Sequence, residues 1–223
     1  MTKKKGQNIS LKPVTISHIT AISRDAYVLS FPRSLEFQAG QVIAIGLNEE
    51  DDPRVYSIAS GCDDPMIDIL FNIKPEGHLT PSLARMKAGD TIWISQAFGS
   101  FLGNTGPACW IAAGTGIAPF RSMLRSGQFM DKTMIHGGRY LDSFYFSSEF
   151  SAVLGEKFVR CCSQEIAKDT YHGRVTAYLE SMTDLPEDMS YYLCGSAEMV
   201  IECREILLLK GIAFMNIHSE VYF

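Results

Sequence analysis

The chain has 223 residues, 46% of them hydrophobic, so it can form one large domain or two small ones with their own cores. Its net charge of −5 argues against nucleic acid as the main partner, and no apolar run reaches the roughly 18–20 residues of a membrane span. The six cysteines lack the spacing of zinc or iron–sulfur sites. We therefore expect no metal, no secretory signal and a reducing, cytoplasmic setting.

The N-terminal half predicts a small antiparallel β-barrel. The expected strands are residues 26–31, 41–47, 54–59, 66–73 and 91–95, which are rich in β-branched and aromatic residues and separated by glycine and proline. In the fourth of these, Ile67, Ile69 and Phe71 share one face, whereas Asp68 and Asn72 lie on the other. Successive short strands of this kind are typical of a barrel.

The C-terminal half alternates between strands and helices. The expected strands are residues 108–113, 133–136, 158–162, 191–194 and 216–223, and the expected helices are residues 119–125, 144–154 and 198–210. Gly211 provides a stop signal for the last helix. This alternation predicts an α/β domain with a parallel sheet and crossover helices. We expect a flavin-binding domain over residues 1–104 and a nucleotide-binding domain over residues 105–223.

Residues 54–57 (Arg-Val-Tyr-Ser) place three useful groups on one predicted strand. A guanidinium can hold a pyrophosphate, an aromatic ring can stack on a flavin, and a hydroxyl can donate to the flavin N5. An ordinary strand with an exposed arginine fits these residues equally well. Further along, a helix expected over residues 81–86 offers free N–H groups to a phosphate, but Thr80 as N-cap and Pro81 as first helical residue fit a plain helix start too.

A glycine-rich turn, residues 114–119 (Gly-Thr-Gly-Ile-Ala-Pro), follows a buried strand and precedes a helix. Glycines allow the backbone to approach a phosphate without a clash of Cβ. A single Gly-x-Gly is a weak signal, so a purely structural turn is the alternative interpretation.

Three segments in order, residues 54–57, 77–83 (Gly-His-Leu-Thr-Pro-Ser-Leu) and 87–90 (Lys-Ala-Gly-Asp), resemble the flavin domain of the ferredoxin–NADP⁺ reductase family. The likeness is greatest to the compact bacterial members. It implies that Arg54 binds the FAD pyrophosphate, Tyr56 stacks on the isoalloxazine and Ser57 touches N5. It also implies backbone contacts to the FAD phosphates, which would come from Gly77, His78, Leu79 and Thr80.

On the nicotinamide side, the glycine-rich turn resembles the family's nicotinamide-nucleotide loop, which implies cofactor contacts for Gly114, Thr115, Gly116 and Pro119. The resemblance also places Arg139 at the adenosine side of the dinucleotide and Arg174 at a phosphate. Gln164 stands where the family carries an arginine for the 2′-phosphate of NADP, and an amide cannot replace that guanidinium. NADPH is the expected cofactor and NADH the alternative, while solvated surface charge is the alternative for both arginines.

Residues 193–195 (Leu-Cys-Gly) resemble the family's Cys-Gly segment, which implies that Cys194 lies beside the nicotinamide. A buried small hydrophobic residue is the alternative. Residues 220–223 (Glu-Val-Tyr-Phe) are similar to the family's C-terminal pattern, with Tyr222 covering the flavin ring and Glu220 in the proton and electron path. Phe223 replaces a tryptophan at the FAD site. A strand that packs Val221 and Phe223 into the core is the alternative here.

Together these segments imply an FAD-dependent oxidoreductase with Ser57, Cys194 and Glu220 as catalytic residues. NAD(P)H delivers a hydride to flavin N5, and electrons pass to a ferredoxin or flavodoxin. Two alternatives remain open, an NAD(P)H:flavin reductase that uses free flavin as substrate and a non-catalytic, redox-responsive flavin-binding module. The sequence predicts neither the oligomeric state nor the direction of electron flow.

Overall fold

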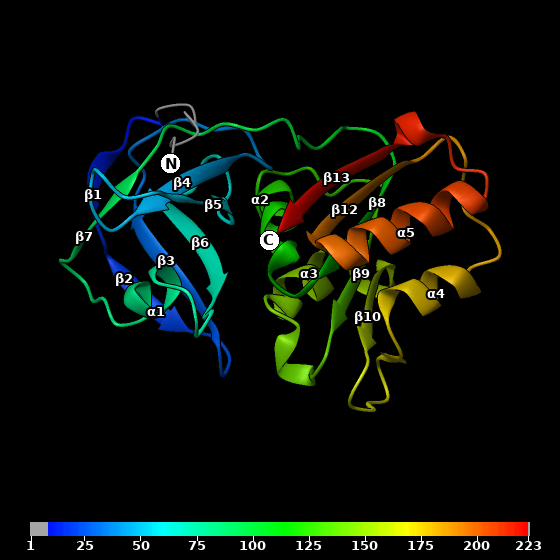
Figure 1. Ribbon diagram of the computed structural model, residues 1–223. Coiled ribbons are helices and arrows are strands. Elements are labelled where there is room, and N and C mark those ends of the chain that lie inside the picture. The colour runs from blue at the N-terminus through cyan, green and yellow to red at the C-terminus, as the bar shows by residue number, and fades with distance from the viewer. Residues whose placement is uncertain (1–8, 223) are drawn as a thin grey trace, which may run out of the picture.

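The computed structural model describes residues 9–222, which form two halves that meet along a seam (Figure 1). The N-terminal half contains two antiparallel sheets, with strand orders β1-β7-β4-β5 and β2-β3-β6. Its strands are β1 (Lys12–Thr15), β2 (His18–Ala21), β3 (Ala26–Pro32), β4 (Val42–Gly46), β5 (Arg54–Ser57), β6 (Met66–Asn72) and β7 (Thr91–Ile94). A bridge between Ile58 and Ile69 joins the two sheets around one apolar core. The predicted antiparallel architecture is confirmed.

Three details of this half differ from expectation. Strands β1 and β2 were not predicted, because each has only four residues and their side chains are mostly exposed. Helix α1 (Leu79–Leu83) begins before the expected residue 81. Thr80 does not cap it, since its Oγ1 accepts a hydrogen bond of 2.8 Å from the backbone N–H of Lys74. That bond fastens the start of α1 to the loop after β6.

The C-terminal half is built on a six-stranded parallel sheet with the order β11-β10-β9-β8-β12-β13. Its strands are β8 (Ala108–Ala113), β9 (Lys132–Gly138), β10 (Phe158–Cys162), β11 (Tyr171–His172), β12 (Ser190–Ser196) and β13 (Ile217–Tyr222). Every neighbouring pair in it runs parallel, which confirms the predicted α/β domain. Strand β13 runs toward the seam, and its C-terminal end lies against the first half (Figure 1).

The helices of this half are α2 (Ala118–Arg125), α3 (Ser147–Leu154), α4 (Val175–Ser181) and α5 (Ala197–Leu209). The 3₁₀ turns are η1 (Gly114–Ile117), η2 (Leu141–Ser143), η3 (Gly155–Lys157) and η4 (Phe214–Asn216). Helix α3 starts three residues after the expected residue 144, because Phe146 adopts a left-handed φ of 58°. Helix α4 was not predicted. Within residues 9–222, no helix has both the length and the apolar character needed to cross a membrane.

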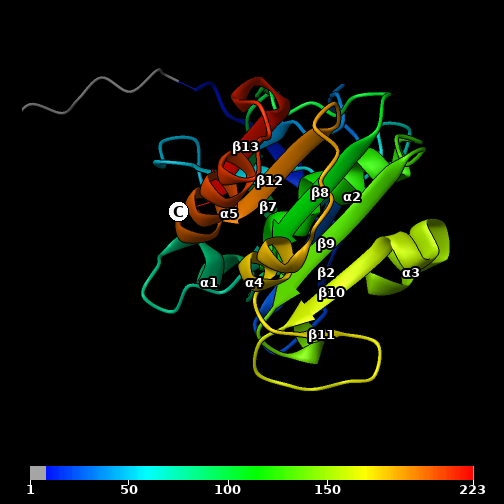
Figure 2. The same cartoon turned by 90° about the vertical axis from the view of Figure 1, so that its right-hand side faces the viewer.

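The sheet of the C-terminal half is covered on both faces, with α2 and α3 on one side and α4 and α5 on the other (Figure 2). The core under α2 and α3 continues across the seam into the first half. There the ring of Phe101 meets the edges of Phe120 and Tyr192, at centroid distances of 5.8 and 5.5 Å. The two halves therefore share apolar packing, which favours a fixed relative orientation.

Candidate functional site

A cleft of about 2130 Å³ runs along the seam and is lined by both halves. One drug-sized ligand usually occupies roughly 300–1,000 Å³, so this cleft has room for more than one. It collects most residues that the sequence singled out: Arg54, Tyr56, Ser57, Gly77, His78, Leu79, Thr80, Gly114, Thr115, Arg139, Gln164, Arg174, Glu220 and Tyr222. Gly116, Pro119 and Cys194 are buried and do not line it. Phe223 lies outside the described residues.

Strand β5 supplies the first wall of the cleft. Arg54 and Tyr56 are two positions apart, so their side chains project from the same face of the strand. The Arg54 guanidinium is largely exposed and lies 2.9 Å from the Asp52 carboxylate. Burial raises the pKa of the Tyr56 phenol to about 12, so this side chain stays neutral at physiological pH. The wall therefore offers one accessible cation and one uncharged aromatic ring.

A chain of hydrogen bonds crosses the seam at the end of β5. The Tyr222 hydroxyl donates to Ser57 Oγ at 2.7 Å, and Ser57 Oγ donates to Glu220 Oε2, also at 2.7 Å. Burial raises the pKa of the Glu220 carboxyl, and the bond from Ser57 opposes this rise. Burial likewise raises the pKa of Tyr222. These three groups can hold or move a proton at the point where the halves meet.

The glycine-rich turn forms the opposite wall. Gly114 has a left-handed φ of 54°, and a Cβ placed there would meet nothing within 4 Å, so its backbone is open to a ligand. Gly116 is different, because a Cβ there would lie 2.1 Å from the backbone carbonyl oxygen of Cys194. Gly116 is thus required for close packing of the turn on β12, whereas Gly114 suits close approach of a phosphate.

His136 on β9 holds this turn, a role that was not predicted from the sequence. Its ring is fully buried, and Nε2 lies 3.0 Å from the carbonyl oxygen of Gly114. Because a carbonyl oxygen only accepts, Nε2 carries the hydrogen and donates it. Burial lowers the pKa of His136 to about 4, so the ring is neutral near pH 7. Its Nδ1 is buried and has no hydrogen-bond partner among residues 9–222.

Cys194 lies on β12 directly beside Glu220 of β13 in the parallel register. The thiol is fully buried. Burial raises its pKa well above the ordinary value, and the neighbouring Glu220 carboxylate raises it further. Cys194 therefore stays a thiol and meets the turn through its backbone rather than the cleft through its side chain.

At the far end of the cleft, charges of both signs follow β9 and β10. The Gln164 backbone N–H donates to the Arg139 carbonyl at 2.9 Å, so the two loops lie side by side. Arg174 precedes α4, is largely exposed and lies 3.6 Å from Glu198 Oε1. Glu165 also lines this end. The carboxylates reduce the positive potential that the two arginines offer to an anion.

Each half of the chain matches the model of a known domain family. Residues 13–102 match the family described as the oxidoreductase FAD-binding domain, and residues 110–205 match the oxidoreductase NAD-binding domain. The flavodoxin/ferredoxin–NADP reductase of Escherichia coli (strain K12) is 31% identical over an alignment of 192 residues, and the match covers 74% of this chain and 77% of that protein. The ferredoxin–NADP reductase of Azotobacter vinelandii is 28% identical over an alignment of 207 residues, and the match covers 78% of this chain and 79% of that protein.

Among solved structures, a ferredoxin NADP⁺ reductase from Neisseria gonorrhoeae with bound FAD and NADP superposes with a TM-score of 0.87. The match covers 96% of this chain and 99% of that one at 22% sequence identity. At this identity the superposition establishes the shared fold. The open backbone of Gly114, the aromatic and cationic groups of β5 and the size of the cleft all suit two dinucleotides.

Proposed function

Because the chain belongs to the ferredoxin–NADP reductase family, we propose that it is an FAD-dependent oxidoreductase that moves electrons between NAD(P)H and a one-electron carrier, ferredoxin or flavodoxin. The observation that carries the proposal is the hydrogen-bonded set of Ser57, Glu220 and Tyr222, which joins the two halves inside the shared cleft. When bound, the flavin supplies the chemistry, since it accepts a hydride and releases electrons singly.

In this proposal, β5 and the loop before α1 hold the flavin. Arg54 binds the pyrophosphate, the ring of Tyr56 packs on the isoalloxazine, and Ser57 Oγ hydrogen-bonds to N5. Its position between the Tyr222 hydroxyl and the Glu220 carboxyl supports this role for Ser57, because either neighbour can orient the hydroxyl. Residues 77–80 line the cleft, and their backbone is assigned to the phosphates.

The nucleotide binds on the other wall. Gly114 and Thr115 line the cleft and are assigned to the nicotinamide end, while the buried Gly116 and Pro119 shape the turn. Cys194 supports the same turn through its backbone carbonyl. The main contribution of such a site to catalysis is to hold the reacting rings in contact. Proximity and orientation can lower an activation barrier by about 7–11 kcal/mol.

The chain's own residues also handle a proton in this scheme. Glu220 holds a proton at a higher pH than an exposed carboxyl does, because burial raises its pKa. Ser57 Oγ lies 2.7 Å from Glu220 Oε2, and Ser57 also lines the cleft. A proton held by Glu220 can therefore reach the flavin side of the cleft by one hydroxyl relay.

For the nucleotide, we propose NADPH with weak discrimination against NADH. Arg139 and Arg174 are the cations at the adenosine end of the cleft, but Glu198 lies 3.6 Å from Arg174 and Gln164 carries no charge. We also propose a cytoplasmic setting. None of the six cysteines, all within the described residues, forms a disulfide.

The test is stopped-flow reduction of the FAD-loaded protein by NADPH and NADH at matched concentrations, followed by transfer to purified ferredoxin or flavodoxin. We expect bleaching of the flavin by both nucleotides, a modest preference for NADPH and an increased preference in Gln164→Arg. Protein that stays colourless after incubation with FAD would refute the proposal. Rapid reduction of added free flavin without carrier reduction would support the flavin-reductase alternative, which the matched relatives do not favour.

A further inference from the structure

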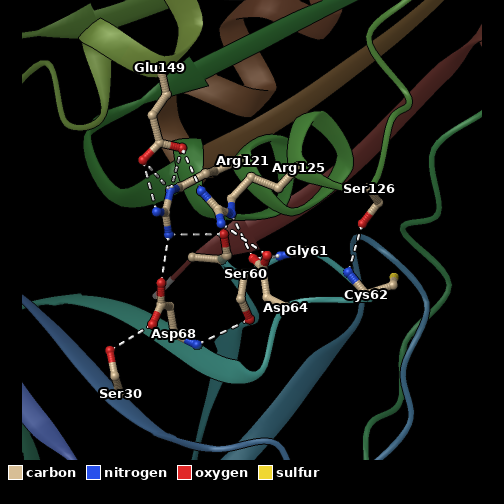
Figure 3. Close-up of polar contacts among 11 residues, drawn as sticks. Ser30, Ser60, Gly61, Cys62, Asp64, Asp68, Arg121, Arg125, Ser126 and Glu149 are labelled. Atoms are coloured by element: carbon tan, nitrogen blue, oxygen red, sulfur yellow. Dashed lines mark hydrogen bonds and ion pairs between the residues drawn. The ribbon is translucent and has the colours of Figure 1, made fainter.

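Five charged side chains form a cluster across the seam (Figure 3). Asp64 and Asp68 come from the first half, Arg121 and Arg125 from α2, and Glu149 from α3. None of the five lines the cleft. The cluster is therefore separate from the surface that is assigned to the cofactors.

Arg121 lies at the centre of the cluster. Its side chain is 9% exposed, and Nη1 lies 2.9 Å from Asp68 Oδ2 while Nη2 lies 2.9 Å from Glu149 Oε1. Nε also donates to the Glu149 carboxylate, and the guanidinium lies 4.1 Å from the centroid of the Phe146 ring. Both carboxylates and the ring thus fix the plane of one guanidinium.

Two partners of Arg121, Asp68 and Ala59, belong to the first half, and Asp68 is itself held there by hydrogen bonds. Asp68 Oδ1 accepts a bond of 2.6 Å from the Ser30 hydroxyl, and the Asp68 backbone N–H donates to Ser60 Oγ at 3.1 Å. Arg121 Nη1 also donates to the carbonyl oxygen of Ala59 at 3.3 Å. The guanidinium therefore hydrogen-bonds both to strand β6 and to the segment that follows β5.

These contacts are close in sequence to the two walls of the cleft. Ala59 follows Ser57 by two residues, and Arg121 follows Gly116 by five residues in the same turn-and-helix unit. One side chain therefore connects the segment that carries Ser57 to the segment that carries the glycine-rich turn. Two nearby contacts reinforce the connection, the pair of Arg125 Nε with Asp64 Oδ2 at 2.6 Å and the bond from the Cys62 N–H to Ser126 Oγ at 2.9 Å.

We propose that Arg121 is a positioning residue for hydride transfer, because its guanidinium fixes the orientation of the nucleotide-binding half on the flavin-binding half. This inference rests on the proposed function. A planar guanidinium satisfies two carboxylates and a carbonyl at once, whereas a lysine ammonium presents a single point charge. Charge alone therefore does not replace Arg121.

The experiment compares Arg121→Met and Arg121→Lys with a matched control, Arg160→Met, in the FAD-loaded full chain. Arg160 also pairs with a carboxylate, Asp169, and lies 5.8 Å from the centroid of the Phe144 ring, but all three groups belong to the C-terminal half. The control thus removes an ion pair and a ring contact of the same kinds within one half, without touching the seam.

The first readout is the hydride-transfer rate constant at saturating NADPH, taken from the bleaching of bound FAD in a single turnover. We expect the hydride-transfer rate constant of both Arg121 variants to fall about 10- to 100-fold, since an error of about 1 Å in the placement of the reacting groups costs up to about 100-fold in rate. NADP⁺ affinity and FAD content should change by less than about 3-fold, and the long-wavelength charge-transfer absorbance should weaken. Arg160→Met should stay within about 2-fold of wild type.

A second readout does not depend on activity. In hydrogen–deuterium exchange of the apoprotein, Arg121→Met should speed exchange in residues 57–60 and 114–121, whereas Arg160→Met should leave both segments unchanged. If Arg121→Met does not fold, Asp68→Asn and Arg121→Lys replace it. The double variant of Arg121→Lys and Asp68→Asn should be no more than about 2-fold slower than the slower single variant.

The inference is overturned if the Arg121 and Asp68 variants reduce FAD within about 2-fold of wild type, or if Arg160→Met is slowed as much as they are. Failure of the proposed function looks different. In that case wild-type protein takes no electrons from either nucleotide, while the exchange measurement still decides whether Arg121 orders the seam.

Discussion

Replacing His136 with glutamine should make the stability of the protein less sensitive to acid. The ring is fully buried, and burial lowers its pKa from 6.5 to about 4. A histidine with a lowered pKa contributes stability above its unfolded pKa and loses it as the pH falls through the folded pKa. The contribution of His136 is therefore complete above about pH 6.5 and disappears toward pH 4.

The size of the effect follows from the shift. Each pKa unit corresponds to about 1.4 kcal/mol, so a shift from 6.5 to about 4 corresponds to about 3 kcal/mol. Glutamine at this position does not titrate in the range, and its amide can still donate to the Gly114 carbonyl. We expect the free energy of unfolding of wild type to fall by about 2–3 kcal/mol more than that of His136→Gln between about pH 7 and pH 4.5.

The assay is urea unfolding at a series of pH values with FAD in fixed excess. The difference between the unfolding free energies of wild type and His136→Gln cancels the contributions of other groups. One of these is Glu220, whose raised pKa changes stability with pH in the opposite direction. His18→Gln, on the exposed strand β2, controls for the loss of a histidine as such. Parallel curves for wild type and His136→Gln would refute the reasoning, because they would mean that the buried ring has no influence on acid stability.

Three further outcomes follow from the cleft. Gly116→Ala should destabilise the protein by about 1–3 kcal/mol and weaken NADP⁺ binding, because the new Cβ would lie 2.1 Å from the Cys194 carbonyl oxygen, whereas Gly106→Ala has open space and should be neutral in the same urea titration. Glu220→Gln should gain stability relative to wild type as the pH rises above 4.5, since a raised carboxyl pKa favours the folded state only at acid pH; equal pH profiles would contradict this. Ser57→Ala should slow flavin reduction about 10-fold or more with FAD still bound, and unchanged stopped-flow kinetics would count against its role at N5.

The sequence predicted those elements whose burial follows a regular period. Residues 66–73 gave strand β6 because Ile67 and Ile69 face the core and Asp68 does not. Residues 108–113 gave β8 because they are apolar almost throughout. The edge strand β1 and the helix α4 were not predicted, since the mostly exposed side chains of β1 carry little information about period and α4 is only seven residues long.

The site residues were predicted individually, but their contacts were not. Ser57 and Glu220 were both expected to act on the flavin, yet nothing in a one-dimensional pattern joins residues 163 positions apart. Arg121 appeared as an ordinary helical residue, and its ion pair with Asp68 spans 53 positions. The bond from His136 to Gly114 depends on the order of β8 and β9 in the sheet, which the sequence alone left open.

The seam contains two kinds of contact, which differ in whether a bound cofactor must change them. The hydrogen bonds of Ser57 to Glu220 and Tyr222 lie in the cleft. A flavin whose N5 accepts a hydrogen bond from Ser57 must therefore share or replace them. The contacts of Arg121 with Asp68 and Glu149 lie outside the cleft and need not change. One side of the seam can therefore exchange hydrogen bonds during turnover while the other keeps the two halves in register. Because apolar packing is non-directional, the hydrogen-bonded ion pairs of Arg121 add directional contacts that help to hold the two halves in one orientation.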